Sequence, residues 1–228
     1  MDAQGNQVWD KRYGGAANDI LYSIIESRDE GFLMAGNSYS SVGGEKTQAN
    51  NGPVNTSDIW VIKTDNLGNI QWDKSLGGST NENKFGNITQ TSDNGFFIAA
   101  TSYSQVSGDK TENNLGQENN WVVKLDPTGN VLWDKTIFTS GRDDSGFAYL
   151  LNDGSIVAAN HTNGQIAGYK SQDTYDITKK YCDFWIVKLS NVVPPVADFM
   201  YGTDPVCSRT CIDFTNLSVN AISYQWSF

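Results

Sequence analysis

The sequence predicts an all-β protein made of three repeats, followed by the start of a second β domain. Two series of tryptophans keep one period of about 61 residues. The spacings are 63 and 61 in the first series and 61 and 64 in the second: Trp9, Trp72 and Trp133, then Trp60, Trp121 and Trp185. Runs rich in Val, Ile, Tyr, Phe and Trp alternate with Gly, Asn and Asp, and no helical periodicity accompanies them. A period of this length is typical of stacked or radially arranged units.

Each unit contains four predicted strands, and the units cover residues 2–64, 65–125 and 126–190. In the first unit the strands are NQVWDKRYG, ILYSIIESRD, GFLMAGNSYS and DIWVIKTD. The last of these carries apolar residues on both faces, which favours sheets packed face to face like propeller blades over a sandwich with one solvated face. Three blades are fewer than the roughly four to eight of a closed ring. We therefore expect missing blades or partner chains to complete the ring.

Two kinds of turn recur between the strands. The segment Asp29-Glu30-Gly31 and its counterparts at 93–95 and 153–155 predict hairpins, because Gly, Asn and Asp tolerate positive φ. The pattern Asp-x-x-Gly-Asn, best seen at 65–69 and 126–130, predicts an Asx turn with a left-handed glycine. This turn is expected to connect one unit to the next.

Long polar insertions separate the third and fourth strands of every unit. They cover residues 39–57, 103–119 and 163–182. Insertions at one position of a repeat usually lie on one face of the assembly, often the binding face. Tyr39 and Tyr103 open the first two insertions and are candidates for exposed stacking on a ligand.

The repeat stops after Leu189. Residues 191–195 predict a short linker, and residues 196–228 predict strands at sandwich-like spacing. Cys207 and Cys211 either form a disulfide or stay reduced, and with Cys182 the odd count leaves at least one thiol outside such a pair. Because the chain begins within a repeat and ends on an apolar strand, we expect it to be a piece of a longer protein.

The composition excludes several classes of partner. The net charge is -10, the pI is about 4.4 and 18% of the residues are charged, so nucleic acid and anionic lipid are poor partners. No apolar run approaches the roughly 18 residues of a membrane span. The first residues also lack the charged-then-apolar pattern of a signal peptide.

Few residues suggest catalysis or metal binding. His161 is the only histidine, so a multi-histidine metal site cannot be assembled within this chain, and a polar strand residue is the favoured interpretation of His161. The carboxylates at 143–144, and at 173 and 176, are more typical of solvated loops than of acid–base catalysis. We predict no catalytic and no cofactor-binding residue.

Calcium is the one ion that the loops suggest. Asp109, Glu112 and Asn113 offer closely spaced oxygen ligands, which a hard cation prefers. The ordered Asp-x-Asp-x-Asp-Gly spacing is missing and a lysine lies among them. An ordinary hydrogen-bonded loop is the alternative.

Charged residues recur as regularly as the tryptophans. Three lysines share one strand face, and three aspartates follow the first tryptophan series: Lys63, Lys124 and Lys188, then Asp10, Asp73 and Asp134. They either form ion pairs that fix the register or line a central channel, and the structural interpretation is favoured because blade packing repeats while a functional site rarely does. The tryptophans are likewise expected to be packing anchors and not sugar platforms.

The repeat DNLGNIQWDKSLGG at 65–78, with NNWVVKLD at 119–126, resembles the propeller-type repeats of large secreted bacterial proteins that use type IX secretion. The tail, with IDFTNLS at 212–218 and YQWSF at 224–228, resembles the first half of an immunoglobulin-like domain of the polycystic-kidney-disease (PKD) type. The resemblance implies an extracellular or cell-surface, non-catalytic, multidomain protein with a sorting domain at its far C-terminus.

These observations favour a secreted structural or adhesive module that binds a protein or glycan surface through its loops. Two alternatives stay open. One is an accessory domain of a secreted hydrolase with its catalytic residues elsewhere. The other is a subunit of an extracellular fibre or surface filament, because unpaired strand edges are expected at both ends of the repeats.

Overall fold

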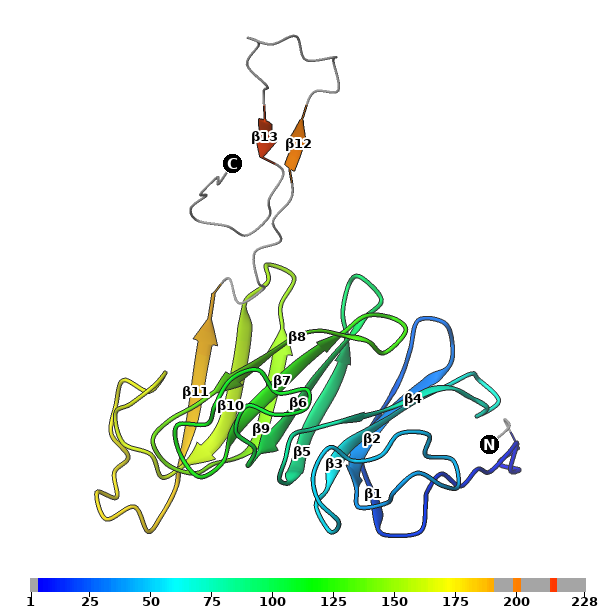
Figure 1. Cartoon of the computed structure of the whole chain (residues 1–228), viewed down its shortest axis with the longest axis horizontal. Helices are drawn as coiled ribbons and strands as arrows, with labels where there is room; N and C mark the ends of the chain where they lie inside the picture. Colours follow the sequence, from blue (N-terminus) through cyan, green and yellow to red (C-terminus); the bar gives the residue numbers. More distant parts are fainter. Residues whose placement is uncertain (1–3, 191–198, 202–213, 217–228) are drawn as a thin grey trace.

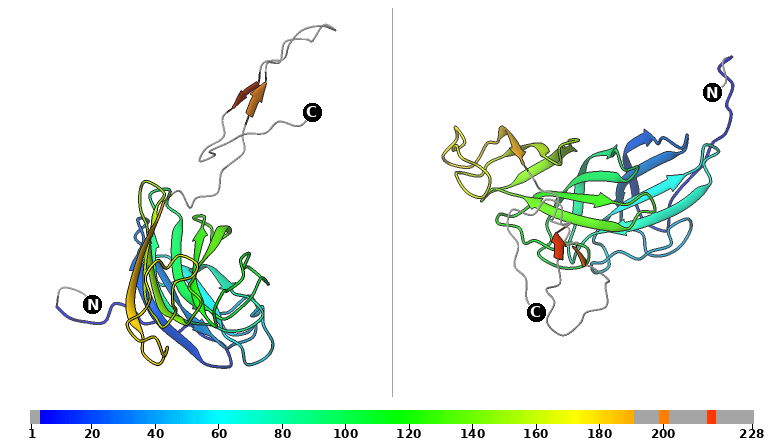
Figure 2. Two further views of the ribbon diagram at one scale, coloured as in Figure 1. Left: turned by 90° about the vertical axis from the view of Figure 1, so that its left-hand side faces the viewer. Right: turned by 90° about the horizontal axis from the view of Figure 1, so that it is seen from above.

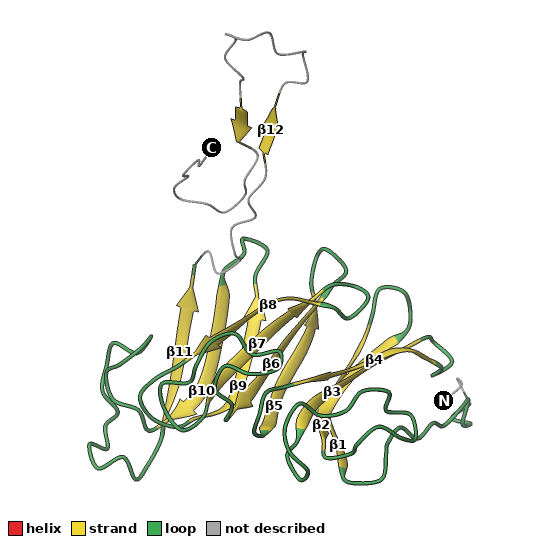
Figure 3. Ribbon diagram, viewed as in Figure 1, coloured by secondary structure: helices red, strands yellow, loops and turns green. Residues whose placement is uncertain are grey.

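The computed structural model describes residues 4–190, 199–201 and 214–216, in which it has thirteen strands and no helix (Figures 1 and 3). Every strand pair is antiparallel. The predicted all-β class is confirmed. The predicted linker 191–195 and the cysteines Cys207 and Cys211 lie outside the described residues. Of the predicted second domain, the structure describes β12 (Phe199–Tyr201) paired with β13 (Phe214–Asn216).

The remaining eleven strands form three sheets in chain order. Sheet 1 consists of β1 (Asp19–Glu26), β2 (Phe32–Ser38), β3 (Asp58–Thr64) and β4 (Ile70–Leu76). Sheet 2 consists of β5 (Glu82–Gln90), β6 (Phe96–Ser102), β7 (Asn119–Leu125) and β8 (Val131–Ile137). Sheet 3 consists of β9 (Asp143–Leu150), β10 (Ile156–Thr162) and β11 (Asp183–Leu189).

The sheets divide the chain one strand later than the predicted units 2–64, 65–125 and 126–190. The strand with the Trp-Asp-Lys sequence closes a sheet, because the short Asx turn pairs it with the strand just before it. The Asx turn is therefore a hairpin within one sheet and not the connection between two. The first copy of this strand, residues 7–15, is not in a strand, and sheet 3 has no fourth strand among the described residues.

Both predicted turn types are present. In the hairpin after β1, the Ser27 amide donates to the Gly31 carbonyl oxygen at 2.9 Å and Glu30 has φ 65°. In the Asx turn after β7, the Asp126 carboxylate accepts from the amides of Thr128 and Asn130 at 2.8 and 2.9 Å. These bonds lower the pKa of Asp126 to about 2, although burial acts in the opposite direction.

The core lies between the faces of successive sheets, which follow one another in space (Figure 2). One cluster joins sheet 1 to sheet 2 and includes Ile59, Val61, Ile98 and Trp121. A second cluster joins the other face of sheet 2 to sheet 3 and includes Val122. Sheet 2 is thus covered on both faces, which explains why all seven residues of β6 and all seven of β7 are buried.

The recurrent strand lysines form ion pairs with the hairpin after the first strand of each sheet. Lys63 Nζ lies 2.8 Å from Asp29 Oδ2, and Lys124 Nζ lies 2.9 Å from Asp93 Oδ2. The Trp-Asp-Lys aspartates have other partners, described below. The lysines therefore fix the hairpins against the neighbouring strands and do not pair with the Trp-Asp-Lys aspartates.

Gly129 in the second Asx turn tests how tightly successive sheets pack. It has φ 83°, and an added Cβ would lie 2.8 Å from the ring of Trp72 on the preceding sheet. We expect Gly129→Ala to lower the free energy of unfolding by about 2 kcal/mol, because a strained φ and a clash act together. Gly5 has a similar φ of 85° with no atom within 4 Å of its added Cβ. Urea unfolding of Gly5→Ala should show a loss of no more than about 1 kcal/mol, and equal losses for the two variants would contradict the packing argument.

Candidate functional site

The three long loops lie at one edge of the sheets, which we call the loop edge: residues 39–57, 103–118 and 163–182 (Figure 1). The loops also contact one another and the segments that connect the sheets. Asn51 Nδ2 of the first loop donates to Asp109 Oδ2 of the second at 3.0 Å. Glu118 of the second loop accepts from Arg142 Nε at 2.6 Å, just before β9. The three predicted insertions therefore form one continuous surface.

Each loop is anchored by a buried lysine. A short turn closes at 43–46, 107–110 and 167–170, and in each case its last residue is the lysine. Lys46 Nζ donates to Ser75 Oγ at 2.8 Å and lies 5.6 Å from the centre of the Trp60 ring. Lys110 Nζ donates to Thr136 Oγ1, and burial lowers its pKa to about 8. All three loops contain the sequence Gly-x-Lys, which is the signal from which these anchoring lysines could have been predicted.

The aspartate of the Trp-Asp-Lys strand fastens the loop to its sheet. Asp73 Oδ2 accepts from the Trp60 indole nitrogen at 2.9 Å and from the Thr47 amide at 3.0 Å. Asp134 Oδ2 accepts from the Trp121 indole nitrogen at 2.7 Å, and Thr111 donates to it in the same way at 3.0 Å. The tryptophans Trp60 and Trp121 are buried, so they are packing anchors and not exposed sugar platforms.

Buried carboxyl groups lie beneath the loop edge. Glu82 accepts from the Gly78 amide at 2.9 Å and from Ser102 Oγ at 2.8 Å. Burial raises its pKa to about 7 despite these bonds, and burial likewise raises the pKa of Asp58 to about 6. The bonds of Glu82 join the segment between sheets 1 and 2 to the end of β6. Asp58 accepts from the Asn51 amide at 2.7 Å and so joins the first loop to the beginning of β3. Both carboxyl groups have a structural role.

The calcium candidates bond to different protein donors. Asp109 accepts from the Gly77 amide at 3.1 Å. Glu112 forms an ion pair with Lys135 at 2.7 Å, and Asn113 Oδ1 accepts from the Val106 amide at 2.8 Å. In the part of the chain that the structure describes, no group of three or more His, Cys, Asp or Glu side chains could hold a metal ion.

Tyr39 and Tyr103 are both partly buried at the base of the loops. The Tyr39 amide donates to the Asn18 carbonyl at 2.9 Å, and the Tyr103 amide donates to the Asn81 carbonyl at 3.0 Å. Burial, together with the charge of Glu118, raises the pKa of the Tyr103 hydroxyl. Their backbones thus fix the beginning of each loop.

The loop edge exposes aliphatic side chains at equivalent positions instead. Val42, Val106 and Ile166 each lie four residues before a buried lysine, and their exposed fractions are 60%, 54% and 59%. More apolar side chains are exposed on the same loops: Val54, Leu115, Tyr175, Ile177 and Tyr181. These exposed side chains could not be recognised as a group from the sequence, because each of them stands alone in a polar stretch.

Asp143 and Asp144, one of the acidic pairs considered for catalysis, bind different partners. Asp143 is buried and accepts from the Thr139 amide and from Asn119 Nδ2, both at 2.6 Å. Asp144 pairs instead with Lys84, and His161 Nε2 lies 3.5 Å from its Oδ2. Asp143 and Asp144 therefore do not face a common space.

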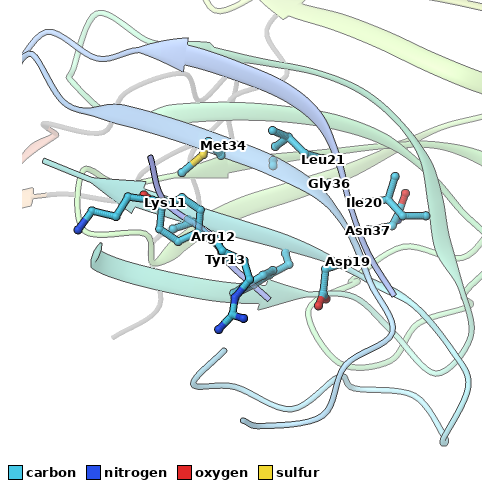
Figure 4. A pocket seen from close by; sticks show the side chains of 12 residues that line it. Lys11, Arg12, Tyr13, Asp19, Ile20, Leu21, Met34, Gly36 and Asn37 are labelled. Carbon is cyan, nitrogen blue, oxygen red and sulfur yellow. The ribbon is translucent and has the colours of Figure 1, made fainter. Parts of the chain in front are cut away.

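A cavity of about 310 Å³ lies on the outer face of sheet 1. Figure 4 shows the N-terminal residues Lys11, Arg12 and Tyr13 along one side of it and Met34 and Leu21 along another. Its floor includes Trp60 and Ile62, so the lining is largely apolar.

In comparison with known proteins, no family model matches the sequence, and no curated protein matches it significantly. Within the described ranges, no helix has the length and apolar character needed to cross a membrane.

Proposed function

We propose that this chain is a non-catalytic, extracellular or cell-surface binding module that holds a protein or glycan surface with its loop edge. The observation that carries the proposal is the repeated exposure of Val42, Val106 and Ile166 at equivalent positions of three rigidly anchored loops. Single exposed aliphatic residues are common on protein surfaces, but a row at one repeat position on one edge is typical of a binding surface.

The finer architecture that we propose is a propeller-like arrangement, with each sheet as a blade and with the first part of a PKD-type domain after it. The 61-residue period and the packing of sheet 2 on both faces support the blades. The resemblance to type IX-secreted proteins supports the extracellular location. In this arrangement the sheets are the scaffold, and the loops carry the specificity.

A filament subunit is the second candidate. It is favoured by β11, which among the described residues pairs with β10 alone and leaves its other edge open.

Replacing Val42, Val106 and Ile166 by aspartate tests the binding function. We expect the triple variant Val42→Asp, Val106→Asp, Ile166→Asp to keep its fold, because all three side chains are exposed. It should lose at least tenfold in binding to a glycan array or to immobilised cell-surface protein, where the unmodified chain binds. Leu67→Asp is the matched control: Leu67 is 59% exposed in the Asx turn at the opposite end of β3. Unchanged binding by the triple variant would refute the role of the loop edge.

A further inference from the structure

The N-terminal segment, residues 9–14, contacts sheet 1 in the way that β4, the fourth strand of sheet 1, contacts sheet 2. The ring centres of Trp9 and Phe32 lie 6.0 Å apart at 62°. Trp72 of β4 meets Phe96 of sheet 2 in the same way, at 6.0 Å and 58°. Trp9 thus contacts sheet 1 as the fourth strand of sheet 1 contacts sheet 2.

The other end of the segment repeats this correspondence. The Gly14 carbonyl accepts from the Glu45 amide at 3.1 Å, as the Gly77 carbonyl accepts from the Asp109 amide at 2.9 Å. The Gly14 amide in turn donates to the Glu45 carboxylate at 3.1 Å, and the Gly77 amide donates to Asp109 at 3.1 Å. The segment is therefore docked like β4 at both ends, but residues 7–13 are not part of a strand in this structure.

Among the described residues, sheet 3 lacks the fourth strand that sheets 1 and 2 have. Its last strand, β11, is equivalent to β3 and β7, which each pair with a following Trp-Asp-Lys strand. Phe184 and Ile186 on its outer face are 99% and 70% exposed. Their equivalents Ile59 and Val61 are fully buried against sheet 2.

The outer face of sheet 1 is the natural counterpart of that exposed face. Met34, Trp60 and Ile62, which line its cavity, are equivalent to Ile98, Trp121 and Val123, which pack against sheet 1 from sheet 2. On β1, Ile24 is 55% exposed, whereas its equivalent Ile88 is buried. Met34, Trp60 and Ile62 are themselves buried, with Tyr13 packed against them. The outer face of sheet 1 is therefore exposed at Ile24 of β1, and the outer face of sheet 3 is exposed at Phe184 and Ile186.

We propose that residues 7–13 of one copy of this chain add to β11 of a second copy as the fourth strand of its sheet 3. The register follows from sheets 1 and 2 and places Lys188 opposite Trp9, Val187 opposite Asp10 and Trp185 opposite Arg12. Added strands of this kind gain main-chain hydrogen bonds along a free edge. The outer faces of sheets 3 and 1 of the two copies are buried at the same time. This inference does not depend on what the loop edge binds.

The side chains around β11 match the incoming strand. In sheets 1 and 2 the aspartate accepts from a tryptophan indole and from the threonine after the anchoring lysine. Sheet 3 has donors of the same kind at the equivalent positions, Trp185 and Ser171. Arg12 is a departure from this match, because it stands where the other sheets have a hydroxyl that accepts from the anchoring lysine. Lys170 Nζ donates instead to the Gln172 carbonyl at 2.6 Å.

The contact is heterologous, because donor and acceptor are different surfaces. Two copies joined by two such contacts bring six sheets together, since each copy has three, and six lies within the range of about four to eight that closes a ring. A contact that does not close would extend into a filament. Both assemblies contain the same strand addition.

Two complementary variants test the proposal by sedimentation velocity. The unmodified chain should form a species of at least twice the 25.1 kDa of one copy at high micromolar concentration and dissociate on dilution. Asp10→Lys disables the donor strand, and Phe184→Asp with Ile186→Asp disables the acceptor. Each variant alone should be monomeric. Mixed in equal amounts they should form a heterodimer and nothing larger, because one donor and one acceptor remain intact.

Val54→Asp is the control for an added surface charge, since Val54 is 87% exposed at the loop edge, and it should associate like the unmodified chain. Circular dichroism of all variants checks that the sheets are retained. A monomeric unmodified chain would overturn the proposal and assign the fourth strand to a further sheet of the same polypeptide. Failure of the mixed variants to associate would also overturn it, because a symmetric interface or an unrelated contact would then explain any dimer.

Discussion

Trp121→Ala is expected to lower the free energy of unfolding by about 3–5 kcal/mol, the usual range for a large aromatic side chain lost from a core. Trp121 is fully buried between sheets 1 and 2. Its indole nitrogen also donates to Asp134, and its ring lies 6.0 Å from the ammonium of Lys110. The substitution therefore leaves a cavity, an aspartate with one donor fewer and a buried lysine without its aromatic neighbour. Urea unfolding followed by circular dichroism measures the loss.

Trp185→Ala is the matched control for this prediction. Trp185 is the equivalent residue of β11, but it is only partly buried and packs at the margin of the second cluster. Measured at a concentration low enough to keep the chain monomeric, its loss should be about 1–2 kcal/mol, because less apolar surface returns to water. Equal losses at the two positions would contradict the assignment of the core to the space between sheets 1 and 2.

The free energy of unfolding is expected to pass through a minimum between about pH 7 and pH 8. The pKa of Glu82 is raised from 4.5 to about 7, so the folded state holds more protons than the unfolded state between these values. Stability therefore falls as the pH rises from 4.5 to 7. The pKa of Lys110 is lowered from 10.5 to about 8, so the folded state holds fewer protons in that interval and stability rises with pH. Each limb amounts to as much as about 3 kcal/mol.

Two substitutions separate the limbs. Glu82→Gln should reduce the fall between pH 5 and pH 7, where the part below about pH 6 that is due to Asp58 remains. Lys110→Met should reduce the rise above pH 8, where the part that is due to Lys46 remains. Glu26→Gln is the control, because Glu26 is an exposed carboxylate on β1, and it should leave both limbs unchanged. The measurement is the urea midpoint from pH 5 to pH 9. A profile that is flat over this range in the unmodified chain would show that the two groups are solvated in the folded state.

The strands and their turns could be predicted from the sequence because their signals are local. Apolar runs bounded by Gly, Asn and Asp define β2 and β6, and the Asx turn is written in five consecutive residues, as at 65–69. The grouping of strands into sheets was displaced by one strand, since the period alone does not say where a repeating unit begins. Only the pairing of β4 with β3 decides that.

The loops that form the loop edge could be located from the sequence, but the residues that are exposed on them could not. Tyr39 and Tyr103 were predicted as exposed stacking residues because they are aromatic, but they are partly buried at the beginning of the loops. The exposed residues, such as Val106, are aliphatic and isolated in the sequence. The buried lysines were equally hidden, because a lysine in a polar loop is normally solvated. Burial of Lys46 depends on Trp60 and Ser75, which are distant in sequence.

The buried lysine has a consequence for how these loops can change over evolutionary time. In the second loop the chain is held at Lys110 and again at Asn114, whose amide donates to the Ser102 carbonyl at 2.8 Å. The residues around Val106 can therefore be substituted with little effect on the sheets. Copies of the unit that share the scaffold are free to acquire different specificities, and a designer could graft a peptide at the same position.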